Sequence, residues 1–405
     1  MSVPKLRFKE FDGEWTKYKI AEVTEYLVDG THFSPKSTDG EFKYITSKNI
    51  RNDGLDLTNI SYISKDEHES IYKRCKVQLG DILLTKDGAN TGNCCLNTLD
   101  EEFSLLSSVA VLRGKNQSFD NNFILQILQS DLGQNTIVSS MSGQAITRIT
   151  LTKLKDYSFN FPEFKEQTKI ASFLSAVDEK ISQLTQKHQL LSQYKQGMMQ
   201  KLFSQQIRFK ADDGSEFGEW KKTEIKNISK IFDGTHQTPN YVTAGVPFYS
   251  VEHVTANNFK NTKYIAEDVY LAELKRVQLE KGDILLTRIG DIGTCKLIDW
   301  DVRASFYVSL ALIKVNKQHS SSFVNQYIKS NLFQKELHER TIHVAFPKKI
   351  NLGEIGLCLI QLPCLEEQTK IANFLSAIDQ KIDVVSEQLE QAKLWKKGLL
   401  QQMFV

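Results

Sequence analysis

At 405 residues the chain is too long for one ordinary hydrophobic core, and its 40% hydrophobic and 25% charged residues are typical of soluble globular domains. No run approaches the roughly 18 apolar residues that cross a bilayer, and the first residues lack the apolar stretch of a signal peptide, so we expect a cytoplasmic protein. Six cysteines without CxxC spacing indicate free thiols, and a net charge of +2 neither requires nor excludes a nucleic-acid partner.

The chain consists of two homologous halves, roughly residues 1–205 and 206–405. Short segments recur in the same order: "RFK" at 7–9 and 208–210, "DGTH" at 29–32 and 233–236, and "GDILLT" at 80–85 and 282–287. Near the end of each half, "EQTKIASFLSAVDEKI" at 166–181 returns as "EQTKIANFLSAIDQKI" at 367–382. A unit of about 200 residues is far longer than a solenoid repeat, so each half is predicted to be one copy of a larger structure.

Each half begins with about 160 residues of mixed pattern. Strand-like runs at 77–85 and 107–113 precede an amphipathic helix at 123–141, and the second half repeats this order with a strand at 307–315 and a helix at 323–341. A proline followed by glutamates then marks the start of a long helix. We therefore predict an α+β fold, with domains over 1–162 and 206–363 and helices over 163–205 and 364–405.

A heptad pattern runs through each predicted long helix. Alternate steps of four and three residues meet eight apolar residues in ten from Ile170 to Leu202, and nine in ten from Ile371 to Met403. A 3.5-residue repeat of this length predicts a coiled-coil pair, although a helix packed on its own domain is the alternative.

Lys195 and Lys396 fall at the same position of the two seams, where they either set the register or lie at a frayed end. Two homologous halves tend to be related by a pseudo-two-fold axis. Antiparallel helices would then form a spacer between the two domains.

None of the catalytic motifs that we sought occurs in the chain. No two prolines are adjacent, which excludes the amino-methyltransferase tetrapeptides NPP[YF] and DPP[YF], and there is no GxxxxGK[ST], GxSxG or HExxH sequence. Asp81 lies near Lys86 but has no second acidic partner at nuclease spacing, so a strand that runs into a turn is the favoured interpretation. We expect any catalysis to belong to a partner.

On these residues the chain resembles the specificity subunit of type I restriction-modification systems. The resemblance rests on the pattern P-x-x-x-E-Q-x-x-I-x-x-F-L-S-A-[VI]-D at 162–178 and 363–379, on the helix ends "KQGMMQKLF" and "KKGLLQQMF", and on the paired DGTH and GDILLT segments. It covers essentially the whole chain.

The resemblance implies two target recognition domains, each reading one half of a bipartite site on double-stranded DNA, with an antiparallel coiled-coil spacer that sets the gap. It also implies that two copies of a DNA adenine methyltransferase dock on the spacer, and that motor-nuclease subunits complete a restriction enzyme. The chain itself would hold no catalytic residue, metal or cofactor, and S-adenosylmethionine would bind to the methyltransferase. A coiled-coil adaptor whose two domains bind proteins remains the alternative.

Residues that differ between the halves within matched sequence are the candidates for base recognition, because identical residues cannot distinguish two half-sites. Asn suits adenine, Arg and Lys suit guanine, and Glu can accept from cytosine N4. The alignment of "YITSKNIR" with "FYSVEHVT" pairs Lys48 with Glu252, Asn49 with His253, and Arg51 with Thr255. A solvated strand end is the alternative for this segment.

Further cations are candidates for contact with bases or phosphates. Lys86 and Arg288 follow the two GDILLT segments, and the difference between them changes the geometry of a possible guanine contact. The alignment of "GQAITRITL" with "VAFPKKINL" pairs Arg148 with Lys349, next to Lys348, which indicates phosphate contact. For DGTH a scaffold role is favoured because Asp-Gly forms turns. Phosphate donation by His32 and His236 stays open.

The candidates for partner contact lie in the long helices. Phe173 and Phe374 are one place off the seam, so they pack on a recognition domain or on the methyltransferase. Gly197 and Gly398 sit inside predicted helix, where glycine costs about 1 kcal/mol relative to alanine, which suggests the close approach of another backbone. The repeated helix starts add four more candidates, Glu166, Gln167, Glu367 and Gln368.

Overall fold

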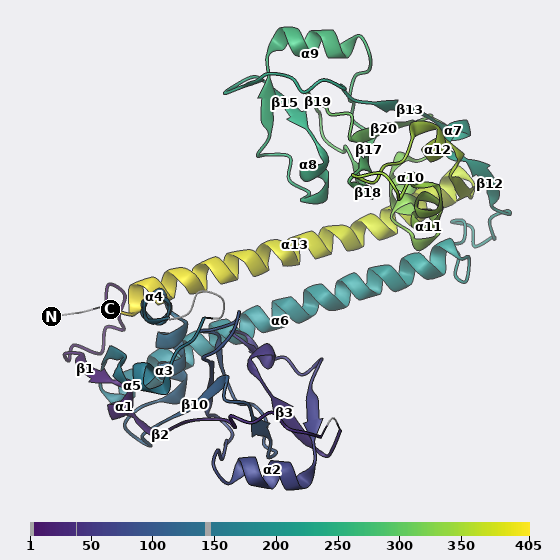
Figure 1. Cartoon of the computed structure of the whole chain (residues 1–405). Helices are drawn as coiled ribbons and strands as arrows, with labels where there is room; N and C mark the ends of the chain where they lie inside the picture. Colours follow the sequence, from purple (N-terminus) through teal and green to yellow (C-terminus); the bar gives the residue numbers. More distant parts are fainter. Residues whose placement is uncertain (1–3, 38, 142–146) are drawn as a thin grey trace. The chain divides into compact units, whose positions relative to one another are not determined.

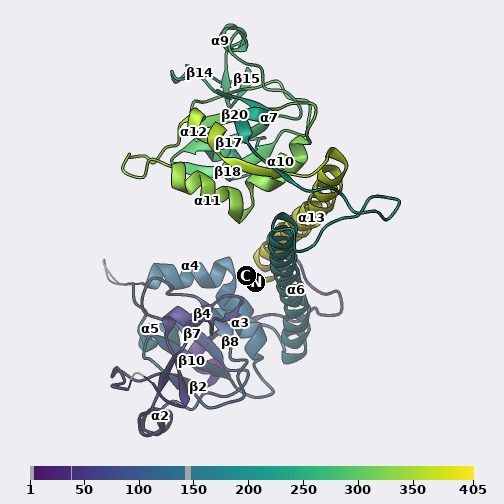
Figure 2. The same ribbon diagram turned by 90° about the vertical axis from the view of Figure 1, so that its right-hand side faces the viewer.

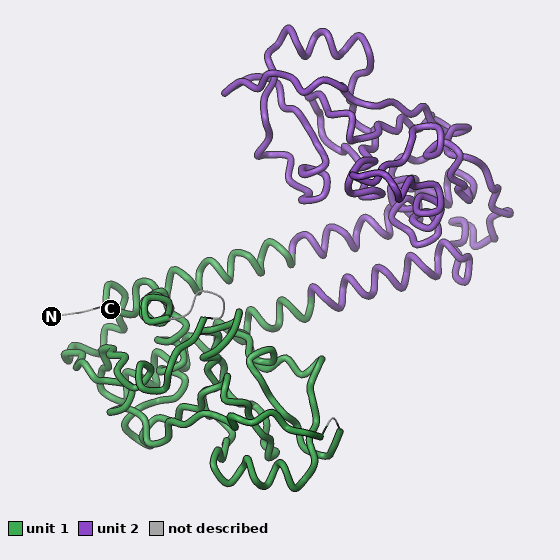
Figure 3. The backbone as a smooth tube through the Cα atoms, in the orientation of Figure 1, with its two compact units in different colours: residues 1–187, 385–405 green, residues 188–384 purple. Residues whose placement is uncertain are grey.

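The computed structural model describes residues 4–37, 39–141 and 147–405, which form two compact units (Figure 3). Unit 1 comprises residues 1–187 and 385–405, and unit 2 comprises residues 188–384. Each unit therefore combines one mixed domain with the beginning of one long helix and the end of the other. The predicted domain bounds, 1–162 and 206–363, stay a prediction, since compactness joins these ranges to the helices.

The centre of unit 1 is an antiparallel four-stranded sheet in the order β2 (Thr24–Asp29), β10 (Val109–Gly114), β7 (Ile82–Thr85) and β8 (Cys94–Leu96). Successive side chains point to opposite faces of a sheet. Accordingly Leu84 and Leu112 enter one hydrophobic cluster while Leu83 and Val111 enter another. Both faces are covered, which explains why the sequence of these strands is continuously apolar rather than alternating.

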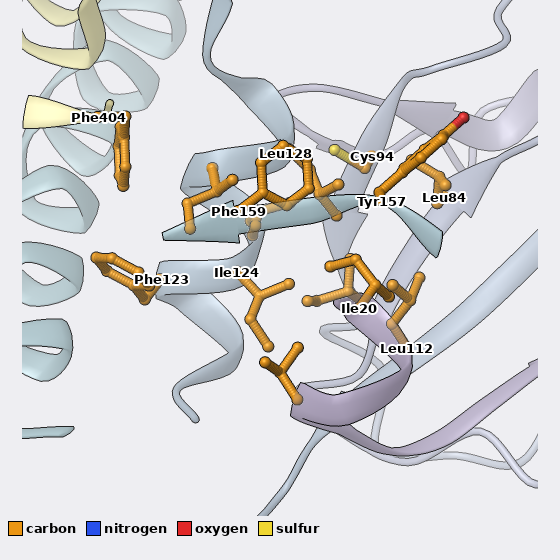
Figure 4. Packing of buried hydrophobic residues seen from close by; sticks show 14 of the residues in the cluster. Ile20, Leu84, Cys94, Leu112, Phe123, Ile124, Leu128, Tyr157, Phe159 and Phe404 are labelled. Atoms are coloured by element: carbon orange, nitrogen blue, oxygen red, sulfur yellow. The ribbon is translucent and has the colours of Figure 1, made fainter. Parts of the chain in front are cut away.

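Helices cover one face of this sheet and a second sheet covers the other. Figures 1 and 2 place α4 and α2 on opposite sides of unit 1. Figure 4 shows the helix-covered cluster, which joins Ile124 and Leu128 of α3 to Leu84 and Leu112 of the sheet, while Phe123 of the same helix lies beside Phe404. The remaining elements of unit 1 are α1 (Ile20–Val23), α3 (Asn121–Gln129), α4 (Asp131–Ser140), α5 (Leu151–Asp156) and the pair β1 (Thr16–Lys19) with β11 (Ser158–Phe161) on the first face, and β3 (Phe42–Ile45), β6 (Ser61–Ile63), β9 (Ser104–Leu105), α2 (Lys65–Tyr72), η1 (Ser47–Asn49), β4 (Ile50–Arg51) and β5 (Gly54–Leu55) toward the second.

Unit 2 repeats most of this order of elements, so the duplication seen in the sequence is also a duplication of the fold. Its central sheet has the order β13 (Ser229–Asp233), β20 (Leu310–Val315), β17 (Ile284–Ile289), β18 (Asp291–Leu297). Its other elements are α7 (Ile225–Ile228), α10 (Ser321–Ile328), α11 (Asn331–Arg340), α12 (Leu352–Leu357), the pair β12 (Lys221–Glu224) with β21 (Leu359–Leu362), the second sheet of β14 (Tyr241–Val242), β16 (Lys263–Ile265), β15 (Val246–Tyr249) and β19 (Ser305–Phe306), and the helices α8 (Val251–Thr255) and α9 (Glu267–Leu274). Unit 2 differs from unit 1 in that α8 replaces η1, β4 and β5 and the strand β14 is added.

The single helices predicted at 123–141 and 323–341 are each two helices, α3 with α4 and α10 with α11. Ser130 has extended backbone, and its side chain accepts a hydrogen bond from the backbone N–H of Gly133, which caps α4. A Cβ atom on Gly133 would lie 2.2 Å from the carbonyl oxygen of Ile127, so α4 turns back closely over the end of α3. Apolar spacing continues through the break, which is why periodicity did not reveal it.

The long helices are α6 (Phe164–Phe203) and α13 (Leu365–Met403), and the predicted antiparallel pairing is confirmed inside each unit. In unit 1, Ile170 and Leu174 near the start of α6 share one core with Leu399 and Met403 near the end of α13. In unit 2 the start of α13 meets the end of α6 in the same way. These seam residues also belong to the domain cores, so each long helix packs on its partner helix and on a mixed domain at once.

The seam lysines set the register of the helix pair. Lys396 Nζ lies 2.6 Å from Asp178 Oδ1 in unit 1, and Lys195 Nζ lies 2.6 Å from Asp379 Oδ1 in unit 2. In unit 2 the Gln326 amide donates to the second oxygen of Asp379 at 2.7 Å. Burial lowers the pKa of Lys195 below its ordinary value despite the nearby carboxylate. The alternative of a frayed helix end is therefore wrong for these positions.

All six cysteines of the chain are free thiols, five of them buried and Cys364 exposed. Among the residues that the structure describes, no helix combines the length and apolar character needed to cross a membrane.

Removing the carboxylate of the Lys195–Asp379 pair should lower the free energy of unfolding more than removing the lysine charge does. We expect Asp379→Ala to lower the free energy of unfolding by about 2 kcal/mol, because it leaves the lysine buried without its carboxylate. We expect Lys195→Met to cost less than about 0.5 kcal/mol, since it removes the desolvation cost of the lysine and leaves Asp379 partly exposed to water, with its hydrogen bond from Gln326. Urea unfolding followed by tryptophan fluorescence measures both, and a larger loss for Lys195→Met would contradict this account. Because the pKa of Lys195 is lowered in the folded chain, the wild type should gain stability relative to Lys195→Met as the pH rises through that pKa toward 10.5.

Candidate nucleic-acid interface

The repeated DGTH segments are built into the scaffold of each unit. Thr31 forms a parallel bridge with Leu106, and Thr235 forms one with Tyr307. A Cβ atom on Gly30 would lie 2.0 Å from the carbonyl oxygen of Leu105, and one on Gly234 would lie 2.0 Å from that of Phe306. Only glycine allows this approach of two backbones. The favoured scaffold role of DGTH is therefore confirmed.

The aspartate of each DGTH segment lies close to basic side chains. His32 Nε2 lies 3.5 Å from Asp29 Oδ1, and the corresponding atom of His236 lies 2.7 Å from Asp233 Oδ2. Arg276 contacts the same Asp233 carboxylate. Both imidazoles remain exposed at the surface beside these carboxylates. Phosphate contact by the two histidines stays a prediction.

The cations that follow GDILLT are bound within the chain. Lys86 is only 2% exposed, and its Nζ lies 3.1 Å from Asp87 Oδ2 and 3.4 Å from Asp29 Oδ2. Arg288 is half-buried and donates to the carbonyl oxygens of Val308, at 2.8 Å, and Ile350, at 3.2 Å. Lys86 in unit 1 therefore contacts carboxylates, whereas Arg288 at the equivalent position of unit 2 contacts backbone carbonyls. The burial of Lys86 places it in the scaffold, which corrects its assignment to DNA contact, whereas contact of the half-buried Arg288 with a base or phosphate stays a prediction.

The candidates Arg148, Lys348 and Lys349 are held by backbone contacts to the turn that follows Lys86 or Arg288. Gly290 has a positive φ of 84°, and its N–H donates to the Lys348 carbonyl at 2.8 Å. Lys349 pairs with Ile289 beside β17, and Arg148 pairs in the same way with Asp87. Lys348, Lys349 and Arg148 are exposed, and Arg148 Nε lies 3.1 Å from Asp87 Oδ1. Residues 143–146 of the aligned segment lie outside the described residues.

The segments 44–51 and 248–255 divide into buried and exposed candidates. Asn49 is 2% exposed and donates to the Asp56 carbonyl at 2.9 Å, while the Nδ1 atom of His253, a residue 5% exposed, accepts from the Ser250 N–H at 2.9 Å. Both residues cap the short helix in which they lie. Their burial assigns them to the scaffold rather than to base contact.

The flanking candidates are open to solvent. Lys48 and Glu252 are exposed at equivalent positions, the first in η1 and the second in α8. Arg51 is half-buried, with Nη2 3.5 Å from Asp56 Oδ2. The same frame therefore presents a cation in unit 1 and a carboxylate in unit 2.

The surface of unit 2 is hollowed around Glu252. This hollow is lined by the residues that follow DGTH and GDILLT and by the second sheet, namely Thr238, Tyr241, Ser250, Val251, Thr255, Lys263, Asp291, Tyr307 and Ser309. A second hollow, lined in part by Asn258 and Lys260, shares Glu252 and Lys263 with the first. Sequence reasoning missed Tyr241, Asp291 and Tyr307, because they come from distant segments and carry no motif of their own.

The glutamate and glutamine at the start of each long helix are buried. Glu166 receives two hydrogen bonds from Arg7, both at 2.7 Å, and Glu367 receives two from Arg208, at 3.0 and 2.6 Å. Gln167 donates to the Pro162 carbonyl at 2.9 Å, as Gln368 does to that of Pro363. The repeated RFK segment thus exists to hold the helix start. All four side chains belong to the interior, which corrects their assignment to a partner surface.

The remaining partner candidates divide into two kinds. Phe173 packs edge-on against Phe8, with ring centroids 5.8 Å apart, and Phe374 packs against Phe209 at 5.7 Å, so each contacts its own unit. A Cβ atom on Gly197 or Gly398 would meet no atom within 4 Å other than its own helix backbone and chain neighbours. The predicted approach of another backbone within the chain is therefore wrong. These helix surfaces are open.

Comparison with known families decides the identity. A family model described as the type I restriction modification DNA specificity domain matches residues 12–193 and 218–394. The chain belongs to this family. As a specificity subunit it supplies DNA recognition to a type I restriction-modification complex, and it is not the catalytic component.

Individual relatives extend over nearly the whole chain. The specificity subunit of the type I restriction enzyme MjaVIII from Methanocaldococcus jannaschii is 25% identical, over 97% of this chain and 94% of the relative. The EcoKI specificity subunit from Escherichia coli K12 is 21% identical, over 93% of this chain and 85% of the relative.

Solved structures share the fold. The S subunit of a type I restriction-modification system from M. genitalium superposes with a TM-score of 0.69 at 19% identity, covering 100% of this chain and 99% of the other. A chain from a study of assembly and conformational transition of the type I system gives a TM-score of 0.53 at 15% identity, covering 97% and 98%. The predicted fold class of a specificity subunit is thereby confirmed.

In the part of the chain that the structure describes, no three His, Cys, Asp or Glu side chains are grouped to hold a metal ion.

The neighbours Glu252 and His253 should respond differently to substitution. We expect His253→Ala to lower the free energy of unfolding by about 1 kcal/mol, because the imidazole caps α8 from a buried position. We expect Glu252→Ala to change it by less than about 0.5 kcal/mol, since the side chain is exposed. Urea denaturation of both variants gives these values. Equal losses of unfolding free energy in the two variants would contradict the division of segment 248–255 into a buried His253 and an exposed Glu252.

Proposed function

We propose that unit 1 reads one half of a bipartite site on double-stranded DNA and that unit 2 reads the other half. The observation that carries this proposal is the pair Lys48 and Glu252. The two residues occupy equivalent exposed positions on a scaffold that is otherwise repeated, and they carry opposite charges.

The chemistry of the two side chains fits different base pairs. A lysine donates to the O6 and N7 atoms of guanine, whereas a glutamate accepts from the N4 amino group of cytosine. Contacts that are common to the halves would go to phosphates, which position the protein without reading sequence. Arg148, Lys349, His32 and His236 are the exposed residues for that role.

The long helices take the role of the spacer. Each helix contributes residues to both units, so the helices link the two recognition surfaces. A 40-residue helix is about 60 Å long. Half-sites on duplex DNA repeat at about 34 Å per helical turn, so helices of this length can set a fixed gap between half-sites.

Two equivalent surfaces on the helices would each bind one DNA adenine methyltransferase subunit. In unit 1 the surface comprises Trp395, which is 55% exposed, with Phe173 beside it at a ring distance of 6.0 Å, and the open Gly398. The equivalent surface in unit 2 comprises Tyr194, Phe374 and Gly197. S-adenosylmethionine would be held by the methyltransferase, and motor-nuclease subunits would join the same assembly.

Methylation mapping tests the recognition proposal. We expect host DNA to carry methylated adenines in one split motif with a fixed nonspecific gap when the chain is co-expressed with its methyltransferase. Glu252→Gln should relax one half of the motif and Lys48→Ala the other half, each by about 1–3 kcal/mol of discrimination. Glu339→Gln, an exposed carboxylate on α11, is the matched control. No methylation, or an unsplit motif, would favour the adaptor.

Native mass of the purified complex tests the docking surfaces. We expect two methyltransferase subunits per chain, and we expect Trp395→Ala to weaken one of the two binding events at least thirtyfold, as the loss of a central aromatic contact does at other interfaces. Leu79→Ala, which removes an equally exposed apolar side chain of unit 1, should have no effect. Unaltered occupancy in Trp395→Ala would place the partner elsewhere.

A further inference from the structure

A loop of unit 2 exposes two apolar side chains completely. Residues 342–349 are closed at their base by an antiparallel bridge between Ile342 and Lys349, whose backbone hydrogen bond measures 2.8 Å. At the tip, Val344 is 97% exposed and Phe346 is 103% exposed. These values exceed those of every other large apolar side chain among the described residues.

The base of this loop is fixed to the central sheet. The Lys349 backbone pairs with Ile289, the Gly290 N–H donates to the Lys348 carbonyl at 2.8 Å, and the Ile350 N–H donates to the Arg288 carbonyl at 3.0 Å. On its other side, the His343 ring donates from Nε2 to the His338 carbonyl at 2.9 Å, which ties the loop to α11. The exposed tip is therefore held on a built support.

The surroundings of the tip select the class of ligand. Single exposed apolar residues are ordinary, but two of them within three residues on a supported loop, as with Val344 and Phe346, are typical of a binding surface. Lys348 and Lys349 follow directly and are exposed, so the ligand is expected to be anionic. Gly290, which holds the loop, precedes Asp291 in the lining of the hollow around Glu252. The loop thus continues the surface to which we assign base recognition.

We propose that loop 342–349 enters a groove of the target duplex, where Val344 and Phe346 contact bases while Lys348 and Lys349 contact the flanking phosphates. This inference rests on the proposed function and adds an apolar contact to the charged contact of Glu252. Phenylalanine suits the task because it packs on thymine methyl groups and inserts against base steps, which polar side chains cannot do. Neither residue has a counterpart in unit 1, where the aligned positions are Gly143 and Ala145, so the contact is specific to one half-site.

Binding of the intact complex to two duplexes tests the loop. One duplex carries the methylated motif, and the other is a scrambled sequence of the same length. We expect Phe346→Ala to lower the affinity for the motif duplex about tenfold, which is typical of losing an aromatic contact with a base, and to leave the scrambled duplex unaffected. The slope of log affinity against log salt should not change, because no phosphate contact is lost.

Two further variants separate the parts of the proposal. The double variant Lys348→Ala with Lys349→Ala should weaken binding to both duplexes and reduce the salt slope by about two, one for each phosphate contact. Leu332→Ala, an exposed leucine on α11, should match the wild type. Since Phe346 is fully exposed, its variant should keep the wild-type unfolding midpoint.

The possible failures are distinguishable. Wild-type affinity of Phe346→Ala for the motif duplex would overturn the role of the loop and leave the proposed function standing. An equal loss on both duplexes would also overturn it, because the side chain would then not read bases. A wild-type complex that fails to prefer the motif duplex would count against the proposed function itself.

Discussion

The structure depends on one packing arrangement, in which the end of each long helix closes the core at the start of the other. In unit 1, Phe404, which directly follows α13, packs on Phe123 of the mixed domain, with ring centroids 5.4 Å apart. In unit 2, Phe203 at the end of α6 packs on Phe323 at 5.8 Å. The lysine–aspartate pairs fix the register of this packing. The recognition domains and the helix pair therefore cannot vary independently of each other.

Glycine, arginine and glutamate residues that recur in both halves serve this frame, while Lys48 and Glu252, which differ between the halves, stand on its surface. Gly30 and Gly234 allow two backbones to touch, and the Arg7–Glu166 and Arg208–Glu367 pairs anchor the helix starts. None of these repeated residues needs to meet DNA. Exposed positions such as 48 and 252 can therefore differ between the halves without disturbing the interior.

Much of the fold could be predicted from the sequence because duplication and heptad spacing are long-range signals. The helices, their antiparallel pairing and the two α+β domains followed from them. The break at Ser130 did not, since apolar spacing continues through it. The candidate site was harder to predict, because an alignment shows which residues differ but not which are buried. Asn49, Lys86 and His253 were plausible DNA ligands by type, yet burial commits them to the interior. The exposure of Phe346 left no trace in the sequence.

The interleaved division of the chain has a consequence for its synthesis. Unit 2 is one continuous segment, whereas the core of unit 1 includes Leu399, Met403 and Phe404, which are translated after the whole of unit 2. Domains usually fold on the ribosome in order from the N-terminus. Here the order is reversed, because the N-terminal domain must wait for the synthesis of residues 399–404 before its core can close. Until then, the nascent chain carries a complete second domain and an unfinished first one.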